Sequence, residues 1–220
     1  MTLLGPPYSG KSEPDVPRAP VHGLVLAAGR GSRFDGGKLH ARYHGRPLLS
    51  YALSMVGRAC ERGLLDAGHA VIDRRDDLAL GLVHSTVLHP IFNDAPEKGI
   101  SRSLRLGLGS LEAAPRVAAA VVFLGDQPQV RLDVIEELLV AWRGGSAVVR
   151  PRYASQPDVP GHPVLLPRSV WPRAAQLEGD SGFSALLGPG SSDTVLVDVP
   201  GDNPDVDTRA DLQRLEGHPG

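Results

Sequence analysis

The segment from residue 21 to residue 38 constrains the fold of this chain more than any other. A short apolar run, Leu24 to Ala28, leads directly into a glycine-rich loop that carries Arg30, Arg33 and Lys38. Such a run is typical of a buried parallel strand, and its loop then lies at the carboxyl edge of a sheet, where open α/β proteins bind ligands. Glycines let backbone N–H groups approach a phosphate, and the basic side chains supply positive charge. We therefore predict an α/β fold with a phosphate-binding loop.

A second apolar run, Val117 to Leu124, is the longest in the chain and predicts a central strand covered on both faces. It ends in Gly125, Asp126, Gln127 and Pro128. If this strand shares a sheet with the first, the Asp126 carboxylate lies near the phosphate loop, and its hard oxygen suits Mg²⁺. A simple turn hydrogen bond before Pro128 is the alternative.

The remaining periodicity alternates between helix and strand, as expected for an α/β chain. Ser101 is expected either to cap the helix that follows it or to approach a ligand at that helix N-terminus. Residues 64–92 are weakly specified. The expected helices are 47–61, 73–82, 104–111, 133–142 and one after Asp207 or Thr208; the expected strands are 69–72, 85–88, 147–149, 164–166 and 194–199, with a loop over 151–160.

Composition excludes several function classes. The 220 residues favour one domain, which we place at 21–216, and the net charge of −2 gives no basic field for nucleic acid. No apolar run is long enough to predict a membrane span. The single cysteine, Cys60, excludes an internal disulfide and fits a cytoplasmic protein. The proline-rich residues 1–20 predict a disordered or loosely attached arm.

That arm contains a formal P-loop match, G-P-P-Y-S-G-K-S, from Gly5 to Ser12. A working P-loop lies between a core strand and a helix. Only four residues precede Gly5, and the prolines at 14, 17 and 20 prevent a helix after Ser12. We therefore do not assign nucleotide binding to this segment.

The loop after the first strand resembles the signature L-A-A-G-x-[GS]-x-R-[FM]-G-x-x-K of nucleotidyltransferases with a Rossmann-like fold. The match covers Leu26 to Phe34 and then Gly37 and Lys38, while Asp35 departs from the glycine that is usual there. Four later motifs resemble the molybdenum cofactor cytidylyltransferase group: Gly125-Asp126-Gln127-Pro128, Gly161-His162-Pro163-Val164, Gly179-Asp180-Ser181-Gly182 and Asp205-Val206-Asp207-Thr208. The resemblance implies a three-layer α/β/α fold with a mostly parallel sheet.

The resemblance also implies an activity, namely transfer of CMP from CTP to the phosphate of molybdopterin, with Mg²⁺ as cofactor. Ala28 favours cytidine over guanosine, and a recipient molybdoenzyme or its chaperone is a possible partner. A transferase for GTP or another nucleotide and a sugar phosphate, or a non-catalytic nucleotide-binding protein or chaperone of the same fold, stays open. The implied site residues are Arg33, Lys38 and Asp126 for catalysis; Leu26, Ala27, Ala28, Gly29, Arg30, Gly31, Ser32, Arg33, Lys38, Ser103 and Asp126 for the nucleotide; Gly161, His162, Asp180, Ser181 and Gly182 for the acceptor; and Asp126 with Asp207, or else Asp205, for the metal.

Overall fold

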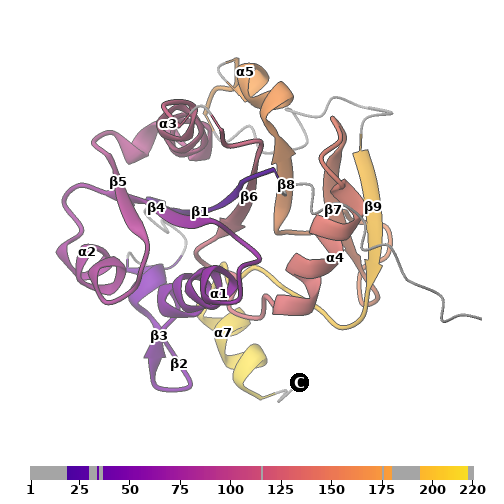
Figure 1. Cartoon of the computed structure of the whole chain (residues 1–220). Helices are drawn as coiled ribbons and strands as arrows, with labels where there is room; N and C mark the ends of the chain where they lie inside the picture. Colours follow the sequence, from indigo (N-terminus) through magenta and orange to yellow (C-terminus); the bar gives the residue numbers. More distant parts are fainter. Residues whose placement is uncertain are drawn as a thin grey trace, which may run out of the picture.

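The computed structural model describes residues 19–29, 34, 37–114, 116–174, 176–179 and 194–217. In this part of the chain a seven-stranded sheet forms the centre of the molecule, in the order β5-β4-β1-β6-β8-β7-β9 (Figure 1). Its strands are β1 (Val21–Ala27), β4 (Ala67–Asp73), β5 (His89–Asn93), β6 (Ala119–Leu124), β7 (Val148–Tyr153), β8 (Val164–Pro167) and β9 (Thr194–Val199), and a separate two-stranded sheet holds β2 (Arg42–Tyr43) and β3 (Arg46–Pro47).

The sheet is mostly parallel, as predicted. β1 pairs in parallel with β4 on one side and β6 on the other, and β4 pairs in parallel with β5. Among the described strands of this sheet, β8 alone runs against its neighbours, β6 and β7. Because Leu26 of β1 lies opposite Leu124 of β6, both strands end at the same level, and the segments that follow them start side by side.

Helices cover both faces of the sheet, which gives three layers (Figure 1). Side chains of α1, α2 and α4 pack in one apolar cluster with one face, and side chains of α3 and α5 pack in a second cluster with the other. The helices are α1 (Leu49–Glu61), α2 (Asp77–His84), α3 (Ile100–Glu112), α4 (Leu132–Trp142), α5 (Trp171–Ala174) and α7 (Arg209–Glu216), with short 3₁₀ segments η2 (Lys38–His40), η3 (Pro96–Lys98) and η4 (Arg168–Val170).

Along each apolar strand, alternate side chains belong to different clusters. In β6, Val121 and Phe123 belong to the first cluster, and Ala120 and Val122 belong to the second. Alternate side chains of a strand point to opposite faces, so a run that is apolar at every position fits a sheet covered on both sides. The Val117–Leu124 prediction is confirmed, with the strand itself covering Ala119–Leu124.

Several local predictions are wrong. The helices expected to start at 47 and 73 begin later, at Leu49 and Asp77, because Pro47 lies in β3 and Asp73 in β4. Residues 85–88 are not a strand. The strand next to β4 is instead β5, which contains Pro90 and lies at the sheet edge, where proline is tolerated. The helix after Gly99 begins at Ile100 rather than at 104, and its N-cap makes no side-chain hydrogen bond, so Ser101 does not cap it. β7 continues to Tyr153, so the expected loop over 151–160 starts later.

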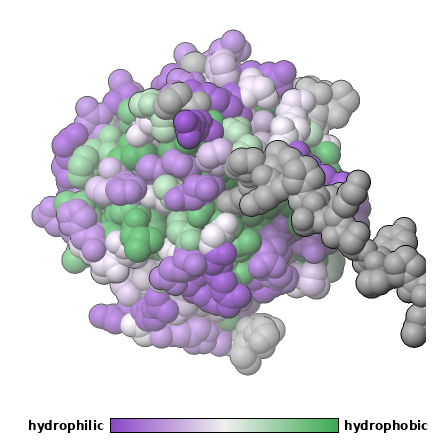
Figure 2. Space-filling view, in the orientation of Figure 1, coloured by the Kyte–Doolittle hydropathy of each residue, from purple (hydrophilic) through white to green (hydrophobic). Residues whose placement is uncertain are grey.

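Hydrophilic and hydrophobic residues are interspersed over the face of the molecule seen in Figure 2. Among the described residues, no helix combines the length and the apolar character that crossing a membrane requires. The predicted arm at 1–20 falls outside the described residues up to position 18.

Candidate active site

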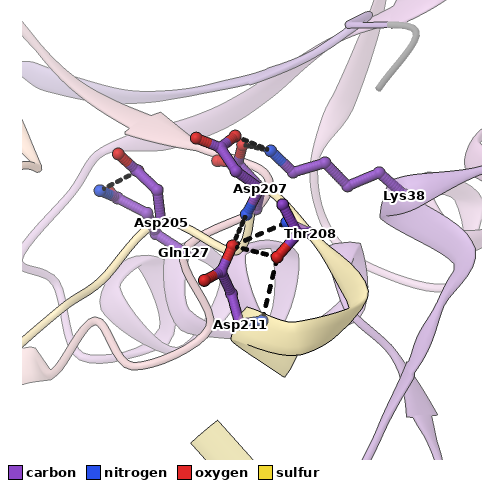
Figure 3. Close-up of polar contacts among 7 residues, drawn as sticks. Lys38, Gln127, Asp205, Asp207, Thr208 and Asp211 are labelled. Carbon is purple, nitrogen blue, oxygen red and sulfur yellow. Dashed lines mark hydrogen bonds and ion pairs between the residues drawn. The ribbon is translucent and has the colours of Figure 1, made fainter. Parts of the chain in front are cut away.

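Lys38 lies at the carboxyl edge of the sheet, where the loop after β1 re-enters the described chain. Gly37 has φ of 68°, a left-handed conformation that favours glycine, and the next residue begins η2. The Lys38 side chain is only 10% exposed. Its Nζ lies 2.6 Å from Asp126 Oδ2 and 2.8 Å from Asp207 Oδ1 (Figure 3). We call Lys38, Asp126 and Asp207 the carboxylate cluster.

Three separate segments build this cluster. Asp126 follows β6, and its backbone carbonyl accepts a hydrogen bond of 3.3 Å from Val206 N. That bond, together with burial of the Val206 side chain, holds the 205–208 segment against the end of β6. Thr208 then caps α7 in a capping box with Asp211, so of the two predicted caps the structure has Thr208 (Figure 3). The capped helix start fixes Asp207 one residue before it.

Asp205 takes a different position from Asp207. Its Oδ1 accepts a hydrogen bond of 2.7 Å from Gln127 Nε2 (Figure 3). Gln127 Oε1 in turn accepts one of 3.2 Å from Asn203 Nδ2. Partial burial of the carboxyl group and the neighbouring Asp126 raise the pKa of Asp205. Of the two candidates for a carboxylate beside Asp126, Asp207 is therefore the one that shares a cation with it.

Electrostatics keep Lys38 protonated. Burial of the ammonium group disfavours its charge, but Asp126 and Asp207 outweigh this effect and raise the pKa of Lys38. A lysine of this kind is a fixed positive charge rather than a proton acceptor at neutral pH. The arrangement can hold anionic oxygen atoms and offset their charge.

The carboxylate cluster also fits a hard divalent cation. Asp126 and Asp207 place two carboxylate oxygens around one positive atom, Lys38 Nζ. In the described part of the chain, no group of three or more His, Cys, Asp or Glu side chains is arranged to hold a metal. Mg²⁺ is commonly bound by one or two carboxylates plus water and substrate phosphates, so two carboxylates are sufficient when the substrate brings phosphate oxygens.

Part of the predicted nucleotide loop lines a small cavity next to Lys38. Its volume is about 190 Å³, and its lining includes Ala27, Ala28, Gly29 and Lys38, together with His40, whose ring lies 2.8 Å from Asp76. Leu26 is buried in the strand. The other predicted loop residues, Arg30, Gly31, Ser32 and Arg33, lie outside the described residues.

Ser103 lies in α3, near the carboxyl end of β5. Its hydroxyl is buried in α3 and accepts a hydrogen bond of 3.1 Å from Asn93 at the end of β5. Arg102 Nε binds Asn93 Oδ1 at 3.0 Å, so the two side chains join the start of α3 to β5. Nucleotide contact by Ser103 stays a prediction.

The predicted acceptor residues Gly161 and His162 line a second, larger cavity of about 630 Å³, between the end of β6 and the loop that joins β7 to β8. We call it the β7–β8 cavity. A Cβ atom on Gly161 would lie 2.8 Å from two ring carbons of Tyr153, so only glycine fits there without a shift. Burial, aided by the charge of Arg150, lowers the pKa of His162 to about 3 and keeps its ring neutral. Asp180, Ser181 and Gly182 lie outside the described residues.

Sequence reasoning missed three polar residues of this region: Gln127, Arg150 and Asn203. Arg150 and Asn203 line the β7–β8 cavity, and Gln127 bridges Asn203 to Asp205. Arg150 carried a usable signal, because an arginine directly after the apolar Ala147-Val148-Val149 run is unusual for a buried strand. Gln127 lies in the Gly125–Pro128 motif, but that motif gave it no role of its own, and Asn203 carried no signal, since loop amides are common.

The chain is similar to several solved structures. It is 29% identical to an Rv0371c homologue from Mycobacterium sp. strain JC1, with a TM-score of 0.76, 91% of this chain covered and 96% of the other. It is 26% identical to Rv0371c of Mycobacterium tuberculosis H37Rv in a complex with manganese, with a TM-score of 0.72, 91% of this chain covered and 99% of the other. A molybdopterin-guanine dinucleotide biosynthesis protein A from Archaeoglobus fulgidus shares the fold at 18% identity, with a TM-score of 0.63, 89% of this chain covered and 97% of the other.

No curated protein sequence gives a significant match. A family model does match: the MobA-like NTP transferase domain aligns with residues 23–198, a range that contains most of β1, Lys38, Asp126 and the β7–β8 cavity residues up to His162. That range covers most of the 220 residues. The chain therefore belongs to the family of MobA-like NTP transferase domains.

Proposed function

We propose that this chain transfers CMP from CTP to the phosphate group of molybdopterin and releases pyrophosphate. The observation that carries nucleotidyl transfer is the contact of one buried lysine with two carboxylates, Asp126 and Asp207, that come from distant parts of the sequence. This cluster lies beside the glycine-rich loop after β1, at the edge of the sheet where α/β proteins bind nucleotides.

The proposed reaction is a displacement at phosphorus. An oxygen of the acceptor phosphate forms a bond to the α-phosphorus of CTP. The bond from that phosphorus to the oxygen shared with the β-phosphate breaks, and the electron pair leaves with pyrophosphate. A phosphate nucleophile is already ionised, so the protein needs no general base. Its task is to bring two anions together and to offset their charge.

In this proposal the described residues have separate tasks. The Lys38 ammonium, held protonated by its surroundings, binds triphosphate oxygens and offsets the charge on the leaving pyrophosphate. Asp126 and Asp207 would hold Mg²⁺, which supplies charge neutralisation on phosphate oxygens. The manganese complex of Rv0371c, a protein 26% identical to this chain, supports a divalent cation in the proposal. Arg33 would act with Lys38.

The more specific part of the proposal is the choice of cytidine as the base and of molybdopterin as the acceptor. Ala28 supports cytidine through the family resemblance, and the residues Gly161 to Val164 and Asp205 to Thr208 support molybdopterin in the same way. The Archaeoglobus protein of the same fold, named for molybdopterin-guanine dinucleotide biosynthesis, keeps GTP as the alternative nucleotide. A sugar phosphate is the alternative acceptor, and a non-catalytic nucleotide-binding role is the alternative without turnover.

Pyrophosphate release separates these alternatives. The full chain is incubated with Mg²⁺, molybdopterin and one of CTP, GTP or ATP, and then with a sugar phosphate in place of molybdopterin. We expect release with CTP and molybdopterin, and none when either is omitted. Preference for GTP, or release only with a sugar phosphate, would replace this more specific part of the proposal. Nucleotide binding without release in any combination would favour the non-catalytic role.

A further inference from the structure

Arg150 is a buried cation that the proposed reaction does not yet use. It lies in β7 and is only 8% exposed. Two residues along the same strand, Arg152 is partly exposed and forms an ion pair of 2.5 Å with Asp198 of β9. Other described arginines also pair with carboxylates, including Arg75, Arg102, Arg131 and Arg214. In the same part of the chain, Arg150 has no such ion pair.

The hydrogen bonds of Arg150 go to neutral groups. Its Nε donates to the carbonyl oxygen of Gly161 at 3.1 Å, and its Nη2 donates to that of Pro160 at 2.5 Å. A guanidinium group has five N–H donors, so these two bonds leave three for another acceptor. The two carbonyls fasten the loop before β8, but neither of them neutralises the positive charge.

The environment of Arg150 makes its charge costly. Burial lowers the pKa of Arg150 to about 10, and no carboxylate of the described residues opposes this effect. The group therefore stays protonated at neutral pH. A buried charge is destabilising unless an opposite charge and hydrogen bonds compensate it. An anionic ligand would supply both.

Arg150 lines the β7–β8 cavity, which is large enough for a small-molecule substrate at about 630 Å³. The same cavity reaches Leu124 at the end of β6 and Asp205, which is bound to Gln127 next to Asp126. Asp202 and Asp205 also line it, and their carboxylates would repel an anion. The favourable position for an anion in this cavity is therefore beside Arg150. The cavity thus joins the buried arginine to the neighbourhood of the carboxylate cluster.

We infer that Arg150 binds the phosphate group of the acceptor and holds it in the β7–β8 cavity for attack on the nucleotide. This inference rests on the proposed function for the attack, but the binding of phosphate at Arg150 does not depend on it. A guanidinium fork matches two phosphate oxygens, and its charge reduces the repulsion between the acceptor and the triphosphate.

A purely structural role for Arg150, fastening the Pro160–Gly161 loop, makes a different prediction. Arg150→Gln keeps a donor for these carbonyls and removes the charge, whereas Arg150→Lys keeps the charge and loses the fork. Under the structural role, both variants should bind phosphate like the original chain. Under the inference, the glutamine variant should bind more weakly than the lysine variant.

The binding test uses inorganic phosphate as the probe, without nucleotide or metal, and measures its Kd by calorimetry on the full chain. We expect Arg150→Gln to raise this Kd by about tenfold or more and Arg150→Lys to raise it less. The matched control Arg152→Gln, on the same strand but outside the cavity lining, should leave it unchanged. Thermal melting shows that each variant is folded.

Two results would overturn the inference. One is a phosphate Kd that does not change in folded Arg150→Gln. The other is tighter binding of malonate than of phosphate at this arginine, which would indicate a carboxylate ligand instead. If phosphate binding is lost in Lys38→Met but unchanged in Arg150→Gln, the phosphate occupies the triphosphate site at Lys38. That outcome is the unchanged Kd named first and overturns the inference.

Turnover separates this inference from the proposed function. With CTP, Mg²⁺ and molybdopterin, Arg150→Gln should raise the KM for molybdopterin by about tenfold and leave the KM for CTP unchanged. An equal rise in both KM values would contradict acceptor binding by Arg150. If the original chain shows no turnover with any acceptor but binds phosphate through Arg150, the proposed function fails and the anion site stands.

Discussion

The carboxylate cluster and the β7–β8 cavity each contain a buried cation, but the two cations differ in their charged neighbours and in the direction of their pKa shifts. Lys38 lies within 2.8 Å of two carboxylates, which raise its pKa. Among the described residues, Arg150 donates hydrogen bonds to two backbone carbonyls and to no carboxylate, and burial lowers its pKa to about 10. The charge of Lys38 is compensated by carboxylates without a ligand, while among the described residues the charge of Arg150 has no carboxylate in contact with it.

This difference predicts how each region binds an anion. A triphosphate that approaches Lys38 must compete with Asp126 and Asp207, unless a divalent cation occupies these carboxylates and leaves the ammonium to the phosphates. An anion that approaches Arg150 has no such competitor among the described residues. We therefore expect nucleotide binding to depend strongly on metal, and acceptor binding to depend on it little.

The largest effect should come from Lys38→Met. The variant removes the fixed charge of the carboxylate cluster, and loss of one charge-stabilising donor costs about a hundredfold to a thousandfold in turnover. Pyrophosphate release measures the effect, and Lys98→Met, an exposed lysine of η3, is the matched control. Turnover within a few-fold of the original chain would remove Lys38 from the proposed mechanism.

The next effect compares the two aspartates before α7. Asp207→Asn removes a carboxylate from the cluster, so we expect turnover to fall by about a hundredfold and the Mg²⁺ concentration for half-maximal rate to rise. Asp205→Asn changes a carboxylate that contacts Gln127 instead, and its effect should be at least about tenfold smaller. Magnesium titrations of both variants check this. The reverse order would make Asp205 the metal ligand.

Gly161→Ala tests how tightly the β7–β8 cavity is packed. The added methyl group would meet the Tyr153 ring at 2.8 Å, so we expect a loss of about 1–3 kcal/mol in the free energy of unfolding. Gly81→Ala, inside α2 with open space around it, should instead be neutral or stabilising by up to about 1 kcal/mol. Denaturant unfolding measures both. Equal values for the two variants would show that the loop moves freely.

His162 should make the cavity region sensitive to acid. Its pKa is about 3 in the fold and 6.5 ordinarily, so below pH 6.5 the unfolded chain gains a proton that the folded chain does not. The free energy of unfolding should therefore fall by about 1.4 kcal/mol per pH unit from this group, until the pH nears 3. Denaturant unfolding across this range should show a shallower slope for His162→Gln. Parallel slopes for the variant and the original chain would mean that His162 titrates normally.

The sequence by itself determined the layered α/β fold. Apolar runs such as Val117–Leu124 are long enough, and apolar at enough consecutive positions, to require a sheet covered on both faces, and glycine and Asp126 mark where the strands end. It also placed Lys38 and Asp126, with Asp207 or else Asp205, in one site, because each follows or precedes a recognisable element within a family motif. β5 escaped prediction because Pro90 and an exposed edge position hide the strand signal.

Only the tertiary structure decided which carboxylate joins the cluster and what surrounds Arg150. Asp205 and Asp207 are two residues apart in a nearly symmetric motif, and the Val206 contact with Asp126 and the Thr208 cap turn Asp207 toward Lys38. Arg150 reads as an ordinary strand residue until the loop at Pro160 and Gly161 covers it. Burial and charge compensation depend on segments that are far apart in the chain, so local sequence patterns do not contain them.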